Sequence, residues 1–264
     1  GCRSYRLGVT SYVYPADILP NVEALAPVID DVELVLFESR PRNTERLAED
    51  VLSNLPDGAM VARLGELARR HALSYTVHFP IDMRLGAEHP AERKAMLGQI
   101  LGIVENTRSL APFGYILHLE GVYRADPPER VRAWRRDLAG QLPQIIRAVG
   151  DAKLLCVENL DYPFEWCDPL LDDFGLGVCV DLGHLWRYGA DVGGHLQRYR
   201  SRARVMHLHG ESCGRDHLPL TMLIPSRLRE MRQALQGFAG VVTLELFEYE
   251  AVRDSLAILA AQGV

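Results

Sequence analysis

The sequence predicts an α/β protein that folds as one single-domain (β/α)8 barrel, a TIM barrel, over residues 1–264. Two observations lead to this prediction. Eight short apolar runs alternate with stretches of helical periodicity along the chain. All but the first of these runs, which ends at Thr10, also end at or beside an acidic residue or a histidine. A barrel explains this bias, because its active site is built at the C-terminal rim of its strands.

The predicted strands are near-continuous apolar segments with little polar alternation. Parallel strands that are covered by helices have this pattern, because both of their faces are buried. The eight segments are Leu7–Thr10, Val32–Glu38, Leu73–Phe79, Gly114–Leu119, Leu154–Glu158, Leu176–Asp181, Ala203–Leu208 and Val241–Leu246.

The segments between the strands carry apolar residues at helical spacing. In the segment Ala59–Ala72, Val61, Leu64 and Leu67 fall on one side, which leaves the charged residues to water. The predicted helices are Ala59–Ala72, Pro90–Ser109, Pro127–Val149, Pro169–Phe174, Gly194–Arg200, Ser226–Leu235 and Ala251–Ala261. Proline-rich rim loops are predicted at Tyr14–Pro20, Phe79–Pro90 and Tyr162–Pro169. No Ser/Gly linker divides the chain, which favours one closed barrel over two doubly wound halves.

Composition restricts the classes of function. The net charge is −6 and no block of like charges stands out, so broad nucleic-acid binding is disfavoured. No segment has 18 consecutive apolar residues, and we expect no membrane span. The five cysteines form no CxxC pair, which favours a reducing, cytoplasmic compartment. The Gly1-Cys2 start is either an expression scar, which we favour, or the mature end of a lipidated protein.

Acidic residues at three strand ends are candidate metal ligands. Glu158 closes a run too apolar for an isolated carboxylate, so it needs a metal or a cation such as arginine. Asp181 and His184 are three residues apart across a turn at Gly183, and both can reach a metal; the alternative is a helix-capping Asp beside a surface His. Glu245 alternates with two leucines and is predicted to point into the barrel.

Histidines extend this candidate set. His207 and His209 share one strand face, so that one can bind metal while the other contacts substrate; for His209 a plain interior histidine is an equal alternative. His78 and His118 occupy equivalent positions on adjacent strands, which favours a ligand role. The loop pair Asp216-His217 is a further candidate.

Glu38 is open to three interpretations. It can be a metal ligand, a general base or an ion-pair partner for Arg40 or Arg42. We expect Glu38, Tyr12 and Asn159 to bind substrate.

Mixed imidazole and carboxylate ligands suit zinc, manganese or iron better than magnesium or calcium. We therefore expect one to three divalent ions, with zinc or manganese first. The candidate ligands exceed what one ion needs, which indicates a two- or three-metal cluster suited to in-line displacement at phosphorus. The predicted metal ligands are His78, His118, Glu158, Asp181, His184, His207, Asp216, His217 and Glu245, and the predicted catalytic residues are Glu158, Glu245 and His209.

Over essentially its whole length the chain resembles the superfamily that joins xylose isomerase-like sugar isomerases and epimerases to zinc-dependent apurinic-site endonucleases. Both branches share the metal positions that fall here on Glu158, on Asp181 with His184, on His207 and on Glu245. The endonuclease branch adds histidines at the tips of strands three and four, where this chain has His78 and His118. That branch also has an Asp-x-His after strand seven. Here Asp216 and His217 are adjacent, a departure that bears on the third metal.

The resemblance implies hydrolysis more than isomerisation. The isomerase branch often uses a lysine near the metal, but Lys94 lies in a predicted helix and Lys153 precedes strand five. An acidic chain does not suit DNA, so a smaller phosphodiester is expected. The opening Gly-Val-Thr-Ser-Tyr-Val-Tyr-Pro-Ala-Asp-Ile-Leu-Pro, together with Val-Glu-Asn-Leu and His-Leu-His-Gly, is similar to cobamide-remodelling phosphodiesterases, which cleave the nucleotide loop of a corrinoid.

Three hypotheses follow. The first is a metal-dependent phosphodiesterase acting on a small molecule. The second is a one-metal sugar isomerase or epimerase, in which Glu158 and Glu245 flank the substrate as acid–base partners. The third is a binding barrel that retains the metal-like rim without turnover. All three expect a small-molecule partner, with neither nucleic acid nor membrane, and leave the oligomeric state open.

Overall fold

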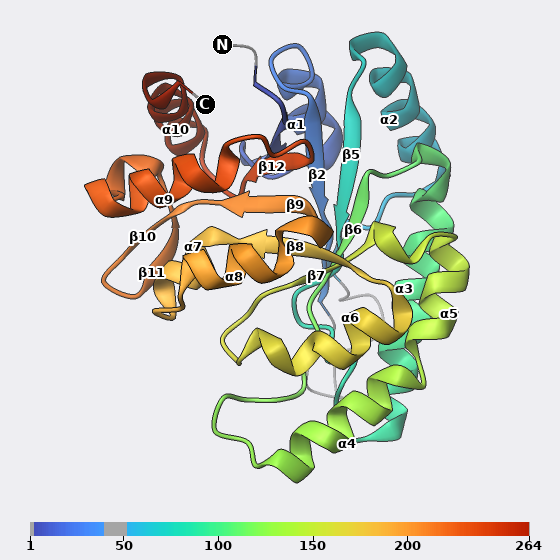
Figure 1. Cartoon of the computed structure of the whole chain (residues 1–264). Coiled ribbons are helices and arrows are strands. Elements are labelled where there is room, and N and C mark those ends of the chain that lie inside the picture. Colours follow the sequence, from blue (N-terminus) through green and yellow to red (C-terminus); the bar gives the residue numbers. More distant parts are fainter. Residues whose placement is uncertain (1–2, 40–51, 264) are drawn as a thin grey trace.

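The structure, a computed structural model, describes residues 3–39 and 52–263 and confirms the predicted (β/α)8 barrel (Figure 1). Eight parallel strands close in the order β1-β12-β9-β8-β7-β6-β5-β2. Their bounds are Arg6–Thr10 (β1), Asp31–Val35 (β2), Ser74–His78 (β5), Gly114–Leu117 (β6), Leu155–Glu158 (β7), Gly177–Asp181 (β8), Ala203–Leu208 (β9) and Val241–Leu244 (β12).

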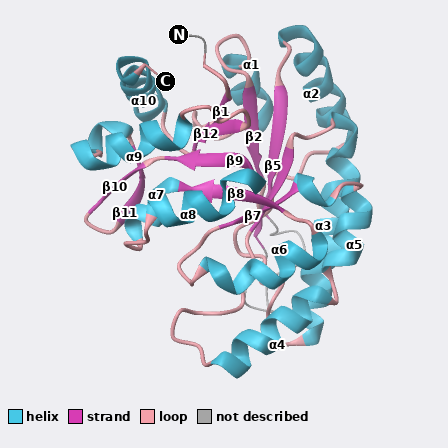
Figure 2. Cartoon of the chain, in the orientation of Figure 1, coloured by secondary structure: helices cyan, strands magenta, loops and turns pink. Residues whose placement is uncertain are grey.

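Helices surround this barrel (Figure 2). The α-helices are Ile18–Leu25 (α1), Gly58–His71 (α2), Pro90–Thr107 (α3), Pro128–Ala139 (α4), Leu142–Val149 (α5), Asp168–Phe174 (α6), Leu182–Arg187 (α7), Val192–Tyr199 (α8), Pro225–Leu235 (α9) and Tyr249–Gln262 (α10). Short 3-10 turns span Arg108–Leu110, Ala152–Leu154, Phe164–Cys167, Arg200–Arg202 and Leu220–Met222. Two antiparallel pairs lie outside the barrel: Glu38–Ser39 (β3) with Leu52–Ser53 (β4), and Gly210–Ser212 (β10) with Arg215–Leu218 (β11).

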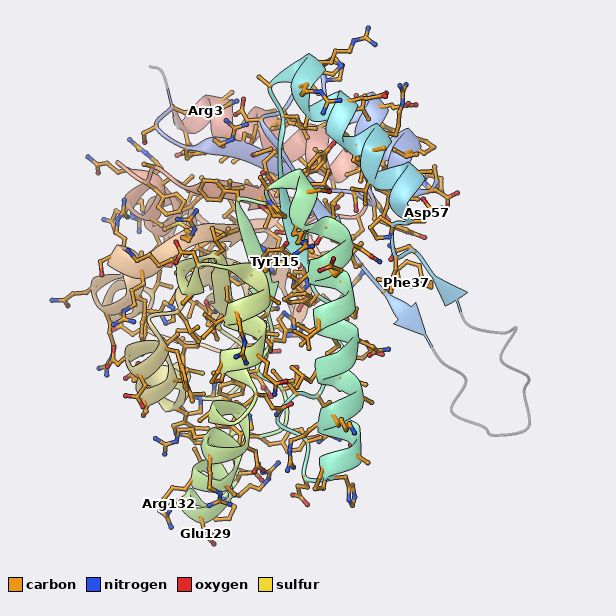
Figure 3. All side chains as sticks on the ribbon, turned by 90° about the vertical axis from the view of Figure 1, so that its right-hand side faces the viewer. Arg3, Phe37, Asp57, Tyr115, Glu129 and Arg132 are labelled. Atoms are coloured by element: carbon orange, nitrogen blue, oxygen red, sulfur yellow. The ribbon has the colours of Figure 1, made fainter. Side chains whose placement is uncertain are left out.

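The apolar core has two parts, because successive strand residues face opposite sides. Tyr115 packs in the layer between the barrel and the helices, whereas Arg132 in the second turn of α4 faces water (Figure 3). The neighbouring Ile116 belongs instead to a separate cluster with residues of four other strands, namely Cys156, Cys179, Val205 and Val241. Two residues further along these five strands the same face carries His118, Glu158, Asp181, His207 and Thr243. The barrel interior therefore changes from apolar to polar just below the C-terminal rim.

The second barrel strand ends at Val35, three residues earlier than predicted. Asn54 explains the early end, since its side chain donates to the Val35 carbonyl (2.8 Å) and accepts from the Phe37 amide (2.7 Å). The chain then leaves the barrel, and Glu38 pairs with Ser53 in the β3–β4 hairpin. The prediction that Glu38 ends a barrel strand is wrong.

One loop prediction and one helix prediction also need correction. The predicted loop Tyr14–Pro20 ends early, because α1 already begins at Ile18; Pro20 is tolerated there, since amides in a first helical turn have no intrahelical partner. The predicted helix Pro127–Val149 is two helices that are separated at Gly140. Pro143 lies in the first turn of α5, where its missing amide costs nothing.

The part of the chain that the structure describes contains no helix long and apolar enough to cross a membrane. Within the same residues the thiols of Cys156, Cys167, Cys179 and Cys213 are free, and only that of Cys213 is exposed.

Candidate metal centre

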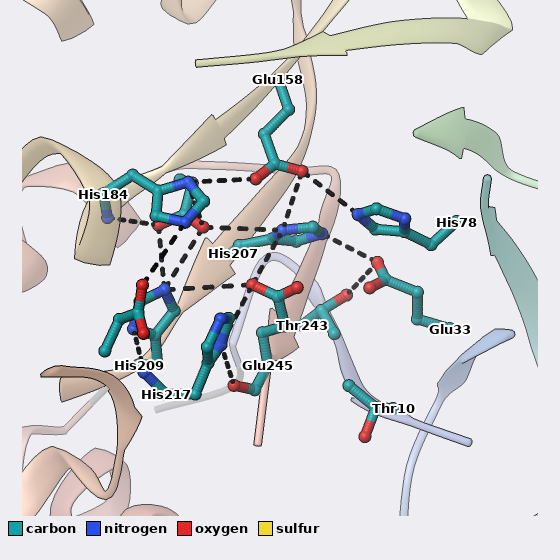
Figure 4. A network of polar contacts seen from close by, with 12 residues as sticks. Thr10, Glu33, His78, Glu158, His184, His207, His209, His217, Thr243 and Glu245 are labelled. Atoms are coloured by element: carbon teal, nitrogen blue, oxygen red, sulfur yellow. Dashed lines mark hydrogen bonds and ion pairs between the residues drawn. The ribbon is translucent and has the colours of Figure 1, made fainter. Parts of the chain in front are cut away.

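Acidic residues and histidines from separate strands converge inside the C-terminal rim. His78, Glu158 and Asp181 are the last residues of β5, β7 and β8. His207 lies near the end of β9, and Glu245 directly follows β12. All five side chains are buried. Because parallel strands end on the same rim, residues far apart in sequence meet at one point (Figure 4).

Glu158 lies at the centre of this cluster. Its Oε2 is 3.2 Å from His118 Nε2 and 3.4 Å from both His78 Nε2 and His207 Nδ1. Its Oε1 is 3.2 Å from His184 Nδ1. One carboxylate surrounded by four imidazoles is a donor set that would suit a divalent metal ion.

The donor atoms form three overlapping groups. Glu158, Asp181, His207 and Glu245 each offer one atom within 4.8 Å of the others. His78, Glu158 and His207 form a second group, whose donor atoms also lie within 4.8 Å of one another. The third group consists of His184, His209 and His217. The described residues thus provide more donors than one ion uses.

Hydrogen bonds outside the cluster fix the tautomers of two histidines. His78 Nδ1 donates to the Phe79 carbonyl at 2.6 Å, and His207 Nε2 donates to Glu33 Oε2 at 2.9 Å. The opposite ring nitrogens, His78 Nε2 and His207 Nδ1, then present lone pairs to the cluster. Metal-binding histidines are oriented in this way by a carbonyl or carboxylate behind them.

The unpaired atoms of the cluster fit a divalent cation. Ten buried polar side-chain atoms of the described residues have no hydrogen-bond partner, and five of them point into this cluster. They are His78 Nε2, His118 Nε2, Glu158 Oε2, His207 Nδ1 and Glu245 Oε2. Tetrahedral zinc with bonds of ~2.1 Å separates its ligand atoms by roughly 3.4 Å. Glu158 Oε2 lies 3.4 Å from both His78 Nε2 and His207 Nδ1, which matches that spacing, and these three residues form one of the donor groups. His118 Nε2 lies 3.2 Å from the same oxygen but belongs to none of the three groups.

The charges of the cluster also call for a cation. Burial alone would raise the pKa of Glu158, but His118 and His207 hold it well below its ordinary value. Burial alone would lower the pKa of His78, but Glu158 raises it to about 9. Asp181 and Glu158 likewise raise the pKa of His184, against desolvation, to about 10. Without a metal, protons on the histidines supply the positive charge that the carboxylates require.

The β10–β11 hairpin brings the adjacent pair Asp216-His217 to the same place. Asp216 is held by Arg187 and lies 3.9 Å from His184 Nε2. His217 Nδ1 donates to the Glu245 carbonyl at 3.1 Å, which leaves its Nε2 available as a ligand atom. His217 has a φ of 52°, a conformation that costs energy for a residue other than glycine. The hairpin therefore places both residues beside the cluster despite their altered spacing.

His209 braces Asp181. Its Nε2 lies 3.2 Å from Asp181 Oδ1, and its Nδ1 accepts from the His217 amide at 3.0 Å. Both ring nitrogens are thus engaged with protein atoms. Gly183 makes room for this ring, since a Cβ there would lie 2.0 Å from His209 Cε1.

Asn159 holds the backbone of Asp181 through two hydrogen bonds. Its amide group donates to the Asp181 carbonyl at 2.9 Å and its oxygen accepts from the Asp181 amide at 2.8 Å. Asp181 also caps α7 by accepting from the His184 amide at 2.7 Å. Asp181 therefore caps a helix, as the alternative interpretation expected, and its carboxylate also belongs to the cluster.

The other predicted substrate contacts lie at the periphery. Tyr12 is an exposed residue of the rim, with its ring edge-on to Phe37 at 6.4 Å. The structure does not describe the side chain of Glu38, and its predicted partners Arg40 and Arg42 lie outside the described residues. Thr10 donates to the Leu246 carbonyl at 2.6 Å and holds the end of β1 against the segment after β12.

Two carboxylates of the site were not among the predicted residues. Glu33 is fully buried inside β2 and accepts from His207. The sequence feature that could have revealed Glu33 is its spacing of two residues from Asp31, which places both carboxylates on the same face of an apolar strand. Glu120 follows His118 by the same spacing, and burial raises its pKa.

A pocket of about 350 Å³ opens over the cluster. His118, Glu158, His184 and Glu245 line it, together with Glu120, Arg187, Ile81 and Tyr123. This volume suits part of a small-molecule substrate.

The sequence model of the family described as "Xylose isomerase-like TIM barrel" matches residues 29–262. The chain belongs to the xylose isomerase-like TIM barrel family. A search of curated protein sequences gives no significant match.

Solved structures of similar fold agree with this assignment. A D-tagatose 3-epimerase-like protein is 20% identical with a TM-score of 0.76, covering 97% of this chain and 96% of its own. A D-psicose 3-epimerase with D-tagatose, from Clostridium cellulolyticum, is 15% identical with a TM-score of 0.70 and 98% coverage of both chains. A protein from Thermus thermophilus that was soaked with ZnCl2 is 23% identical with a TM-score of 0.67, covering 98% of this chain and 97% of its own. At these identities the likeness establishes the fold.

Proposed function

We propose that this member of the xylose isomerase-like family is a metal-dependent hydrolase that cleaves a phosphodiester in a small molecule. The observation that carries the proposal is the set of four imidazoles around Glu158, those of His78, His118, His184 and His207. A one-metal reaction needs only Glu158, Asp181, His207 and Glu245. The additional histidines suit a cluster of two or three ions, with zinc or manganese preferred for these donors.

Each residue of the site has a part in this proposal. His78, His118, Glu158, Asp181, His207 and Glu245 would hold the first two ions. His184, Asp216 and His217 would extend the set of ligands. When bound, such ions neutralise phosphate charge and lower the pKa of a water molecule. Glu33, Asn159 and His209 keep the ligands in position, so His209 acts through Asp181.

Two further side chains of the pocket face the reacting group. Arg187 brings a positive charge into the pocket that can pair with a phosphate oxygen. Glu120, whose pKa burial raises, can hold a proton for the leaving oxygen. Phosphate is thus bound from one side while its leaving group is protonated from another.

The nucleotide loop of a cobamide is the proposed substrate. The acidic chain argues against a long nucleic acid, and the pocket of about 350 Å³ admits one phosphodiester with its neighbouring groups. The resemblance of several sequence strings to those of cobamide-remodelling phosphodiesterases supports this choice among small phosphodiesters.

A sugar epimerase with one ion is the second candidate. The epimerase names of two similar solved structures support it. So does the placement of Glu158 and Glu245, which lie 3.4 and 3.3 Å from the same His207 nitrogen and can flank a substrate as acid and base. This reaction makes no use of His78 or His118.

The variant His118→Ala separates the two candidates, with His89→Ala as a control because His89 is exposed and outside the site. We expect the wild type to hydrolyse bis(p-nitrophenyl) phosphate and the nucleotide loop of cobalamin. His118→Ala should reduce the rate of both reactions at least about 100-fold. We also expect the metal content per chain to fall. Conversion of D-tagatose or D-psicose by a protein with one ion, unaffected by His118→Ala, would establish the epimerase instead.

A further inference from the structure

The β10–β11 hairpin, which carries Asp216 and His217, lies outside the barrel sheet and has a strained backbone (Figure 1). Two of its residues, Cys213 and His217, have a φ of 52° although neither is a glycine. That conformation costs energy and persists only where the surrounding contacts hold it. The residues of β11 are half-buried or exposed, so apolar burial alone does not hold the hairpin.

Glu211, a buried residue of β10, supplies one of the contacts that do. Its Oε1 accepts from the Gly214 amide at 3.0 Å and closes the turn between the two strands. Its Oε2 forms an ion pair with Arg227 Nη1 at 2.5 Å. Burial alone would raise the pKa of Glu211, but the Gly214 amide and Arg227 hold it below its ordinary value. One carboxylate therefore closes the hairpin and ties it to α9.

Arg227 connects the hairpin to a second part of the site. Its Nη1 also donates to the Glu211 carbonyl at 3.2 Å, and its Nη2 donates to the Trp186 carbonyl at 3.5 Å. Trp186 belongs to α7, the helix that carries His184. The Trp186 indole in turn donates to Glu230 of α9 at 2.8 Å. Arg227 thus joins the hairpin to the helix of His184.

His184, Asp216 and His217, here called the outer donors, lie where these two segments meet. The rings of His184 and His217 are 6.3 Å apart, and His184 Nε2 lies 3.9 Å from Asp216 Oδ2. His184 and His217 also belong to one group of donor atoms. Because α7 and the hairpin are separate segments, the spacing of the outer donors depends on how the two are held together. The ligands around Glu158 come mainly from barrel strands, which the sheet itself fixes.

We propose that Glu211 and Arg227 are positioning residues for a metal ion bound by the outer donors, and that ions beside Glu158 do not depend on them. The inference rests on the proposed function, which uses more than one ion, and identifies what holds the outermost ligands. Both carboxylate oxygens of Glu211 are engaged with protein atoms, so Glu211 acts through the hairpin and not as a ligand.

The test measures zinc binding to the metal-free protein by isothermal titration calorimetry and locates the ions in anomalous difference maps. We expect Arg227→Met and Glu211→Gln to weaken the ion at the outer donors at least about tenfold, as is typical for residues behind metal ligands. The ions beside Glu158 should keep their affinity. Arg229→Met is the matched control, because Arg229 is an exposed residue of the same helix.

Two further variants separate positioning from general stability. Arg227→Lys keeps the charge opposite Glu211 and should recover most of the lost affinity. Glu211→Gln keeps an oxygen for the Gly214 amide, so it tests the ion pair even if Arg227→Met does not fold, which circular dichroism shows.

The outcomes distinguish this inference from the proposed function. An equal loss of affinity for all ions would refute the inference, since the pair then serves only general stability. An outer ion that both variants bind as tightly as Arg229→Met does would also refute it. Ions beside Glu158, with none at the outer donors of the wild type, would refute the inference and leave hydrolysis with two ions intact. Selective loss of the outer ion in a protein that hydrolyses no phosphodiester would support the inference and refute only the hydrolase.

Discussion

Replacing Glu33 by Gln should weaken metal binding although Glu33 is not a ligand. Its carboxylate accepts from His207 Nε2 at 2.9 Å and lies 3.4 Å from the Thr243 hydroxyl (Figure 4). Burial alone would lower the pKa of His207, but its neighbours Cys179 and Glu33 help to raise it well above its ordinary value. Gln has the same shape and can still accept the hydrogen bond, but it carries no charge.

The magnitude follows from the loss of one charge-assisted hydrogen bond. Hydrogen bonds to charged groups contribute about 1.5–3 kcal/mol, against about 1 kcal/mol for neutral ones. The difference of about 0.5–2 kcal/mol corresponds to roughly 2- to 30-fold in affinity. This range overlaps the roughly 10- to 100-fold cost that is typical when a partner behind a metal-binding histidine is removed.

Competition with a fluorescent zinc chelator measures this effect. Glu23→Gln is the matched control, since Glu23 forms only an exposed ion pair with Arg63. Circular dichroism of the metal-free variants confirms that both are folded. Equal zinc affinity for Glu33→Gln and the control would refute the inference that Glu33 fixes the donor nitrogen of His207.

Three further predictions concern stability. In the metal-free protein the pKa of His78 is raised to about 9 and that of His184 to about 10, so protonation of these two histidines stabilises the fold below pH about 6.5. This contribution is lost as the pH rises through about 9–10. The melting temperature in EDTA should therefore fall over that window, and a rise would contradict the assignment. Gly183→Ala should lower the free energy of unfolding, measured in urea, by about 1–3 kcal/mol, because the added Cβ would meet the ring of His209. Gly98→Ala should not lower it, because a Cβ there points into open space beside α3. Equal effects of the two variants would refute this packing. Zinc at 100 times its dissociation constant should stabilise by about 2.7 kcal/mol, and no shift in melting temperature would rule out a native metal site.

The barrel was predictable because its strands are buried on both faces. Ala203–Leu208 forms β9 with the predicted bounds, and the other strand segments differ from the observed strands by one to three residues. Val32–Glu38 was too long because apolarity alone does not reveal where a chain leaves a sheet. That point depends on Asn54, a residue 19 positions beyond Val35.

The convergence of the candidate ligands was predictable for a related reason, since a charged side chain at the end of an apolar strand has few stable environments. Glu33 was missed because it lies within a strand and not at its end. Its role depends on His207, 174 residues away in sequence. The bonds of His209 and Asn159 to Asp181 also arise only when β7, β8 and β9 are side by side.

The number of metal ions per chain tests the central claim most directly. Elemental analysis of the purified protein, combined with anomalous difference maps of its crystals, measures both the number and the positions. We predict at least two ions, with His78, His118 and Glu158 binding one and Asp181, His207 and Glu245 binding another. A single ion bound by Glu158, Asp181, His207 and Glu245, with His78 and His118 unligated at saturating zinc and manganese, would contradict the account and favour the epimerase.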